Sequence, residues 1–84
     1  MRLVFTPNGW DDYRHRQTAD RATLKRVNRL IDDVLRDPFA GIGKPERLRH
    51  GLAGCWSRRI TDEHRLVYLV DDDDVVILQA RYHY

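Results

Sequence analysis

The sequence predicts an α+β fold in which two N-terminal helices pack on one face of a twisted, mainly antiparallel β-sheet. Three observations indicate this class. The N-terminal half contains two helical segments, an apolar stripe marks the second of them, and the C-terminal half is a run of short strand-like segments separated by polar turns. Strands joined by short turns pair as antiparallel neighbours, and helices grouped at one end of the chain cover one face of such a sheet.

The first two elements are a short strand and a short helix. Arg2–Thr6 predicts the opening strand, and Asn8 is expected to cap a helix from about Gly9 to Gln17. Helical spacing places Trp10 and Tyr13 on one face, and the residues expected to face solvent near the positive end are Asp11 and Asp12.

The second helix is the clearest element of the sequence. Asp20 is its expected N-cap, and Asp37-Pro38 ends it because the residue before a proline avoids helical geometry. Its apolar stripe consists of Leu24, Val27, Leu30, Ile31, Val34 and Leu35. We interpret this helix as a cover for the sheet.

The remaining chain is expected to form a loop and an antiparallel meander. Phe39–Pro45 is the loop, and Glu46–Arg49 is a brief extended segment. The expected strands are Cys55–Ile60, His64–Val70 and Val75–Tyr82, with turns at Thr61–Glu63 and Asp71–Asp74. A chain of 84 residues leaves no room for a second module, so residues 1–84 are expected to form a single domain with a shallow surface site.

The composition is that of a folded protein of the cytoplasm. It is 42% hydrophobic and 33% charged, and no apolar stretch reaches the ~18 residues that cross a bilayer. No signal peptide is recognisable, so a cytoplasmic protein without membrane contacts is expected. The single cysteine, Cys55, excludes an internal disulfide and is expected to be a small, partly buried apolar residue.

The basic residues are nearly all arginine. Only Lys25 and Lys44 are lysines, and the net charge is +2. Because a guanidinium binds phosphate through two parallel hydrogen bonds, the bias suggests a nucleic-acid partner. GC-rich codon usage would explain the same bias equally well.

Two arginines are expected to face each other on one hairpin. If Thr61–Glu63 is a three-residue turn, Arg59 and Arg65 pair across the strands. Directly opposed like charges are destabilising unless an anion lies between them, and a phosphate would serve. A nearby acid such as Asp62 or Glu63 would also neutralise them, so both interpretations stay open.

One acid and one histidine could perform chemistry together. Alone, Glu46 is typical of an ion-pair partner and His83 of a surface histidine. Combined with arginines, a carboxylate base and a histidine acid suffice for RNA transesterification without metal or cofactor. The base removes the proton of the ribose 2′-hydroxyl, and the acid protonates the leaving 5′-oxygen. Spacing alone does not show that these residues meet.

Four motifs extend this hypothesis: Gly43-Lys44-Pro45-Glu46, Trp56-Ser57-Arg58-Arg59-Ile60, Glu63-His64-Arg65-Leu66-Val67-Tyr68 and Arg81-Tyr82-His83-Tyr84. Together with Trp10–Tyr13, Asp37–Phe39 and the length, they closely resemble the YoeB family of toxins within the RelE superfamily. The resemblance implies a RelE-like microbial ribonuclease fold and a toxin that enters the ribosomal A site and cleaves the messenger RNA there.

The resemblance also implies roles for single residues. Glu46 would be the general base, His83 the general acid and Arg65 the residue that stabilises the phosphate. The implied substrate-binding residues are Lys44, Arg49, Arg59 and Tyr84. Two positions depart from the family pattern, since Arg49 replaces a common lysine and Arg47 a common proline. Neither departure removes a proposed acid or base.

The implied partner is a YefM-like antitoxin whose flexible C-terminal segment covers the site and whose other end binds operator DNA. Toxins of this type can also dimerise. Two other functions stay open. A non-catalytic relative that resembles the gyrase-poisoning ParE toxins would not need the Arg81–Tyr84 ending. A small nucleic-acid- or protein-binding module would tolerate substitution of Glu46 or His83.

Overall fold

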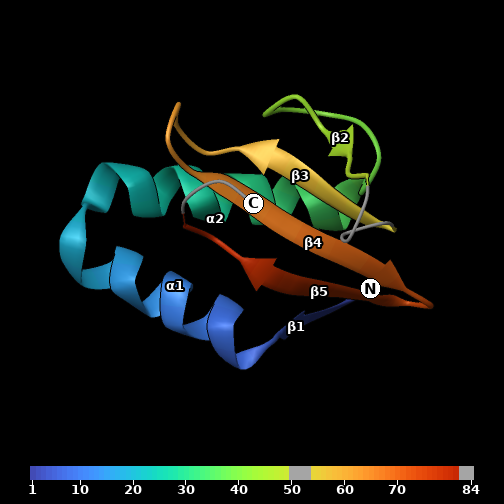
Figure 1. The fold of residues 1–84 in the computed structure, drawn as a ribbon, viewed down its shortest axis with the longest axis horizontal. Helices are drawn as coiled ribbons and strands as arrows, with labels where there is room; N and C mark the ends of the chain where they lie inside the picture. Colours follow the sequence, from blue (N-terminus) through green and yellow to red (C-terminus); the bar gives the residue numbers. More distant parts are fainter. Residues whose placement is uncertain (50–53, 82–84) are drawn as a thin grey trace.

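Five strands form one mixed sheet, and two helices pack against it (Figure 1). The computed structural model describes residues 1–49 and 54–81. In chain order the elements are β1 (Arg2–Phe5), α1 (Pro7–Ala19), α2 (Arg21–Arg36), β2 (Glu46–Arg47), β3 (Cys55–Arg59), β4 (Arg65–Asp71) and β5 (Asp74–Gln79). The strand order is β1-β5-β4-β3-β2, with β1 parallel to β5 and all other pairs antiparallel. The predicted fold class is confirmed.

The start of α1 differs from the prediction. The cap is Thr6, whose Oγ1 accepts a hydrogen bond from the backbone N–H of Gly9 at 3.0 Å, and the helix begins at Pro7. Proline suits the first helical position because its missing N–H would have no partner there. The expected cap, Asn8, instead donates its side-chain amide to the carbonyl of Leu78 at 3.1 Å. Asn8 therefore ties α1 to β5 and does not cap the helix.

The N-terminal half of α1 lies directly against β5. A Cβ on Gly9 would stand 2.2 Å from the carbonyl oxygen of Ile77, so only glycine allows this approach. Asp12 accepts a hydrogen bond from the backbone N–H of Ala80 at 3.1 Å. The prediction that both acids face solvent is thus wrong for the partly buried Asp12, whereas Asp11 is exposed. Trp10 and Tyr13 lie on one face of the helix as expected, and their rings stack with centroids 5.9 Å apart.

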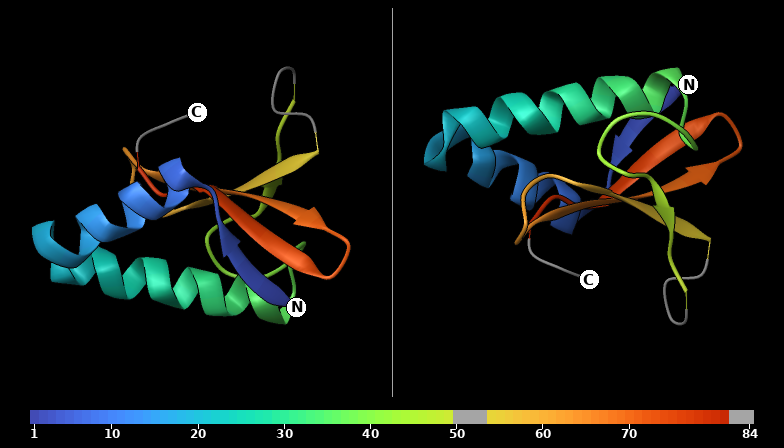
Figure 2. Two further views of the ribbon diagram at one scale, coloured as in Figure 1. Left: turned by 90° about the horizontal axis from the view of Figure 1, so that it is seen from below. Right: turned by 90° about the horizontal axis from the view of Figure 1, so that it is seen from above.

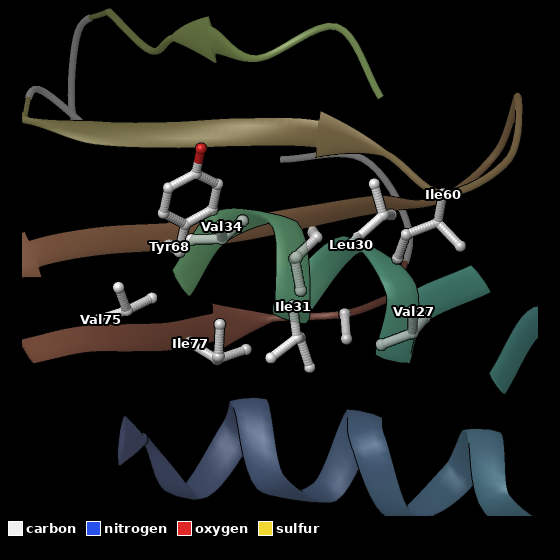
Figure 3. Packing of buried hydrophobic residues seen from close by; sticks show 10 residues of the cluster. Val27, Leu30, Ile31, Val34, Ile60, Tyr68, Val75 and Ile77 are labelled. Carbon is white, nitrogen blue, oxygen red and sulfur yellow. The ribbon is translucent and has the colours of Figure 1, made fainter. Parts of the chain in front are cut away.

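The second helix confirms its predicted limits. Asp20 caps it by accepting from the backbone N–H groups of Ala22 and Thr23, and the helix ends at Arg36, before Asp37-Pro38. Figure 3 shows its apolar stripe meeting the sheet. The fully or nearly fully buried members of the stripe are Val27, Leu30, Ile31 and Val34, and they pack with Ile60, Leu66, Tyr68, Val75 and Ile77. Among the described residues, no helix is long and apolar enough to span a membrane.

The sheet has two unlike faces. Figure 2 shows both helices on one side of it. On the face away from the helices, a smaller apolar cluster is formed by Leu48, Cys55 and Val67. Cys55 is 8% exposed, which confirms the expectation that it is a buried apolar residue, and burial raises the pKa of its thiol. We call this second side the open face.

Candidate active site

The open face carries three of the predicted site residues, Glu46, Arg59 and Arg65. Glu46 of β2 pairs in register with Ser57 of β3, and Ser57 pairs with Val67 of β4. Because side chains alternate along a strand, Arg59 shares the face of Ser57. Directly opposed residues have Cβ atoms about 5 Å apart and diagonal ones about 7–8 Å, so Glu46 lies within side-chain reach of Arg59.

The predicted pairing of two arginines is confirmed. Arg59 lies opposite Arg65 in the β3–β4 register. The hairpin closes through the backbone N–H of Ile60, which donates to the carbonyl of His64 at 3.0 Å, so residues 61–63 form the turn as expected. The two guanidinium groups therefore project from one end of the open face.

Several hydrogen-bond donors on this face lack partners among the described residues. In β3 and β4, four buried side-chain atoms have no hydrogen-bond partner within residues 1–49 and 54–81: Ser57 Oγ, Arg59 Nε, and Arg65 Nε and Nη1. A buried polar group without a partner costs about 1–3 kcal/mol, so native proteins keep few of them and usually for a purpose. Three of these atoms belong to the two opposed arginines, and the fourth, Ser57 Oγ, lies on the same face. An anion with several acceptor oxygens would suit this arrangement.

Positive charge also gathers around His64, at the turn that joins β3 and β4. His64, next to Arg65 in the chain, has a pKa below its usual value, mainly because it is largely buried and then because of the charge of Arg16. Arg81 and His15 lower that pKa further, whereas Glu63 raises it. The imidazole of His64 is therefore neutral at pH 7, in a neighbourhood where positive charge predominates.

The other predicted site residues lie at the margin or outside the described chain. Lys44 is exposed in the turn before β2, with a left-handed φ of 52°. Arg49 is exposed just after Leu48, whose backbone N–H donates to the carbonyl of Cys55 at 2.9 Å. His83 and Tyr84 lie outside the described residues, as does Tyr82 at the end of the expected last strand. The structure thus brings together Glu46, Arg59 and Arg65.

Sequence reasoning gave no role to Ser57 or Arg58. Counting by two from Arg59 would have placed the Ser57 hydroxyl beside Glu46 on the same face. The same count places Arg58 on the helix side, where its side chain is fully buried. An arginine at a core-facing position is the signal that was overlooked.

The acid of the site, Glu46, lies at an exposed edge of the sheet. Hollows of the described surface lie along α2, beside Arg21 and Lys25, beside Tyr13 and Asn28, and beside Arg29 and Arg36. Glu46, on the edge strand β2, is exposed to solvent. A partner that supplies the second wall would be needed to exclude water from chemistry at this surface.

Fold and site together define a small α+β protein with a helix pair on a mixed sheet and an arginine-rich open face. The chain belongs to the YoeB-like toxins of bacterial type II toxin–antitoxin systems, because the model of that family matches residues 5–84. It is 61% identical to the toxin YoeB of Streptomyces coelicolor over 84 residues, which is the full length of both chains.

Solved structures agree with this assignment. A YoeB/ParE toxin from Agrobacterium tumefaciens superposes with a TM-score of 0.97 at 48% identity, covering all of both chains. The YoeB dimer from Staphylococcus aureus gives a TM-score of 0.91, and YoeB in a heterotetrameric complex with YefM from the same organism gives 0.90. Both are 42% identical to this chain and cover all of it and 98% of their own chains.

Proposed function

We propose that the protein is an endoribonuclease that cuts messenger RNA in the ribosomal A site and so blocks translation. The observation that carries the proposal is the cluster of unpartnered donors of Ser57, Arg59 and Arg65 beside the Glu46 carboxylate. A phosphodiester has acceptor oxygens for these donors, and a carboxylate next to it can take the proton of a 2′-hydroxyl.

The reaction divides among three residues. Glu46 removes the proton from the ribose 2′-hydroxyl, which then attacks the phosphorus. Arg65 stabilises the charge that grows on the phosphoryl oxygens, and His83 protonates the 5′-oxygen as its bond to phosphorus breaks. The role of His83 rests on the family resemblance alone. The residues proposed to position the RNA are Lys44, Arg49, Arg59 and Tyr84. The products carry a 2′,3′-cyclic phosphate and a 5′-hydroxyl.

We infer that cleavage depends on the ribosome, because Glu46 is exposed to solvent. Glu46 is exposed to water, where a carboxylate is a weak base, and the described chain offers no lid above it. The ribosome would supply the missing wall. Purified protein that cut naked RNA as fast as ribosome-bound RNA would refute this part of the proposal.

The proposed partner in the cell is a YefM-like antitoxin. YoeB of Staphylococcus aureus, 42% identical to this chain, forms a heterotetramer with YefM and has also been solved as a dimer. We propose the same two associations here, with the antitoxin's flexible C-terminal segment covering the open face and its other end binding operator DNA.

The decisive experiment is a cleavage map on ribosomes programmed with a defined messenger. We expect the wild type to cut within the A-site codon, and Glu46→Gln and His83→Ala to lose most of that cut. Glu63→Gln is the matched control, because Glu63 is the only other glutamate and its side chain is 84% exposed in the β3–β4 turn. It should cut normally.

Two outcomes would overturn the proposal. If the wild type arrests growth or binds ribosomes without cutting, catalysis is wrong, and inhibition of DNA gyrase is the next activity to test. If cutting survives both Glu46→Gln and His83→Ala, the assigned acid and base are wrong. Products with 5′-phosphate ends would point to hydrolysis by another route.

A further inference from the structure

The buried guanidinium of Arg58 forms a hydrogen bond in each of its five N–H directions. Nε donates to the hydroxyl of Tyr68 at 3.2 Å. The acceptors of Nη1 and Nη2 are Asp33 Oδ2 at 2.5 Å and the backbone carbonyls of Ile42, Asp37 and Ala40 at 3.2, 2.6 and 3.2 Å. An arginine has five N–H donors and no acceptor, so this side chain is saturated.

Asp33 and Tyr68 extend this network. Asp33 Oδ2 also accepts from the backbone N–H of Ile42 at 2.9 Å, and the Tyr68 hydroxyl donates to the carbonyl of Pro38 at 2.5 Å. Hydrogen bonds from Arg36, Ile42 and Arg58 lower the pKa of Asp33 to about 2, so its carboxylate is ionised at neutral pH. Burial raises the pKa of Tyr68, which keeps its hydroxyl protonated as a donor.

Every bond of this network on the loop side ends in residues 37–42, between α2 and β2. The next residue, Gly43, is held as well, because its carbonyl accepts from the backbone N–H of Arg59 at 2.7 Å. The loop is packed so closely that a Cβ on Gly43 would lie 2.7 Å from Leu30 Cδ2. Three residues beyond Gly43 the chain enters β2 at Glu46.

The strand that carries Glu46 has few bonds of its own. β2 is an edge strand of two residues, paired on one side only with Ser57 and Trp56 of β3. A strand this short does not fix its own position, so its placement depends on the chain segment that leads into it. The anchored loop is that segment.

We propose that Arg58, Asp33 and Tyr68 form a positioning device for Glu46, acting through residues 37–43. The inference rests on the proposed function, in which Glu46 is the general base. A general base must lie within hydrogen-bond distance of the proton that it removes, and a displacement of about 1 Å costs on the order of a hundredfold in rate. The network keeps Glu46 in position from the helix side of the sheet, where it touches no substrate.

The test removes the hydroxyl of Tyr68 and leaves its aromatic ring in the core. Tyr68→Phe removes the bond to Pro38 and the acceptor of Arg58 Nε. The matched control is Tyr13→Phe, which removes a hydroxyl that donates to Asn28 Oδ1 at 2.7 Å between α1 and α2. Both changes delete one oxygen atom, so both proteins are expected to stay folded.

Two measurements are made on both variants. Amide hydrogen exchange is followed at Arg59 and Leu48, whose N–H groups bind the carbonyls of Gly43 and Cys55. We expect roughly tenfold faster exchange there in Tyr68→Phe only, as suits the loss of one buried hydrogen bond. Cleavage on programmed ribosomes should show a roughly tenfold lower kcat with unchanged KM in Tyr68→Phe, and no change in Tyr13→Phe.

Three outcomes would overturn the inference. Unchanged exchange in Tyr68→Phe would mean that the network does not hold β2. Faster exchange with an unchanged kcat would mean that it does not position the base. A rise in KM alone would indicate a binding role. If the wild type cuts no messenger, the proposed function has failed, and the exchange data still decide whether the network holds β2.

Discussion

Arg58 and Arg59 are neighbours in β3, yet they lie on opposite faces of the sheet and in opposite states. Arg58 points toward α2, is completely buried, and donates to Asp33, Tyr68 and three backbone carbonyls. Arg59 points to the open face, where its buried Nε has no hydrogen-bond partner in the part of the chain that the structure describes. The same type of side chain is thus fully paired at Arg58, whereas at Arg59 it leaves a donor for the proposed substrate.

The two faces of the sheet differ in whether these buried polar groups are hydrogen-bonded. On the helix side Arg58, Asp33 and Tyr68 are paired with one another and with the loop that leads to Glu46, and the pairing holds that loop. On the open face the donors of Ser57, Arg59 and Arg65 have no partner among the described residues, a state that lowers the stability of the free protein and that a bound anion would relieve. Substitutions on the two faces should therefore change different quantities.

The largest effect on the free energy of unfolding is expected from a matched pair of substitutions at Arg58 and Arg59. Arg58→Met should lower the free energy of unfolding by about 3 kcal/mol or more, because it leaves buried carbonyls and the Asp33 carboxylate without their donor. Arg59→Met should change it by less than about 0.5 kcal/mol or raise it. Urea unfolding of both proteins measures the difference. Equal losses would mean that Arg59 is also paired in solution.

A second comparison separates stability from activity on the open face. Arg65→Met should reduce cleavage on ribosomes by about 10²–10³-fold, as expected when a donor to the transition-state charge is lost. Its unfolding should be unchanged, because Nε and Nη1 of Arg65 have no partner to lose among the described residues. Arg29→Met, at an exposed position of α2, is the control and should match the wild type in both assays. Normal cleavage by Arg65→Met would remove Arg65 from the mechanism.

The sequence was informative wherever a pattern was local. The apolar stripe and caps of α2 followed from helical spacing, from Asp20 and from Asp37-Pro38. The Arg59–Arg65 pair followed from the length of one turn and the alternation of side chains. These features depend on a few neighbouring residues, so reading along the chain was enough to find them.

What the sequence did not indicate depends on contacts between distant segments. Asn8 was the predicted cap of α1, but Thr6 caps the helix, and Asn8 instead donates to the carbonyl of Leu78 in β5. Asp12 is turned from solvent by the backbone of Ala80, 68 residues away. The network around Arg58 joins α2, the following loop, β3 and β4, and no spacing rule connects these segments.

An acid titration tests the paired face. The pKa of Asp33 is about 2 in the folded protein, below its ordinary value of 3.8. A lowered folded pKa adds stability that is complete above the unfolded pKa and is lost as the pH falls through the folded one. Wild-type stability should therefore decline between about pH 4 and pH 2 more steeply than that of Asp33→Asn in urea unfolding at each pH. Parallel curves would mean that the bonds of the Asp33 carboxylate to Arg36, Ile42 and Arg58 add no stability.

The smallest effect is expected from the removal of a single hydroxyl group, either that of Ser57 on the open face or that of Thr23 in α2. Ser57 Oγ is buried without a partner among the described residues, whereas Thr23 Oγ1 donates to Asp20 Oδ2 at 2.7 Å. Ser57→Ala should raise the free energy of unfolding by up to about 1 kcal/mol, and Thr23→Val should lower it by a similar amount. Unfolding curves in urea measure both. A loss in Ser57→Ala as large as that in Thr23→Val would mean that the hydroxyl is paired in the free protein, and the open face would then hold one donor fewer for a phosphate.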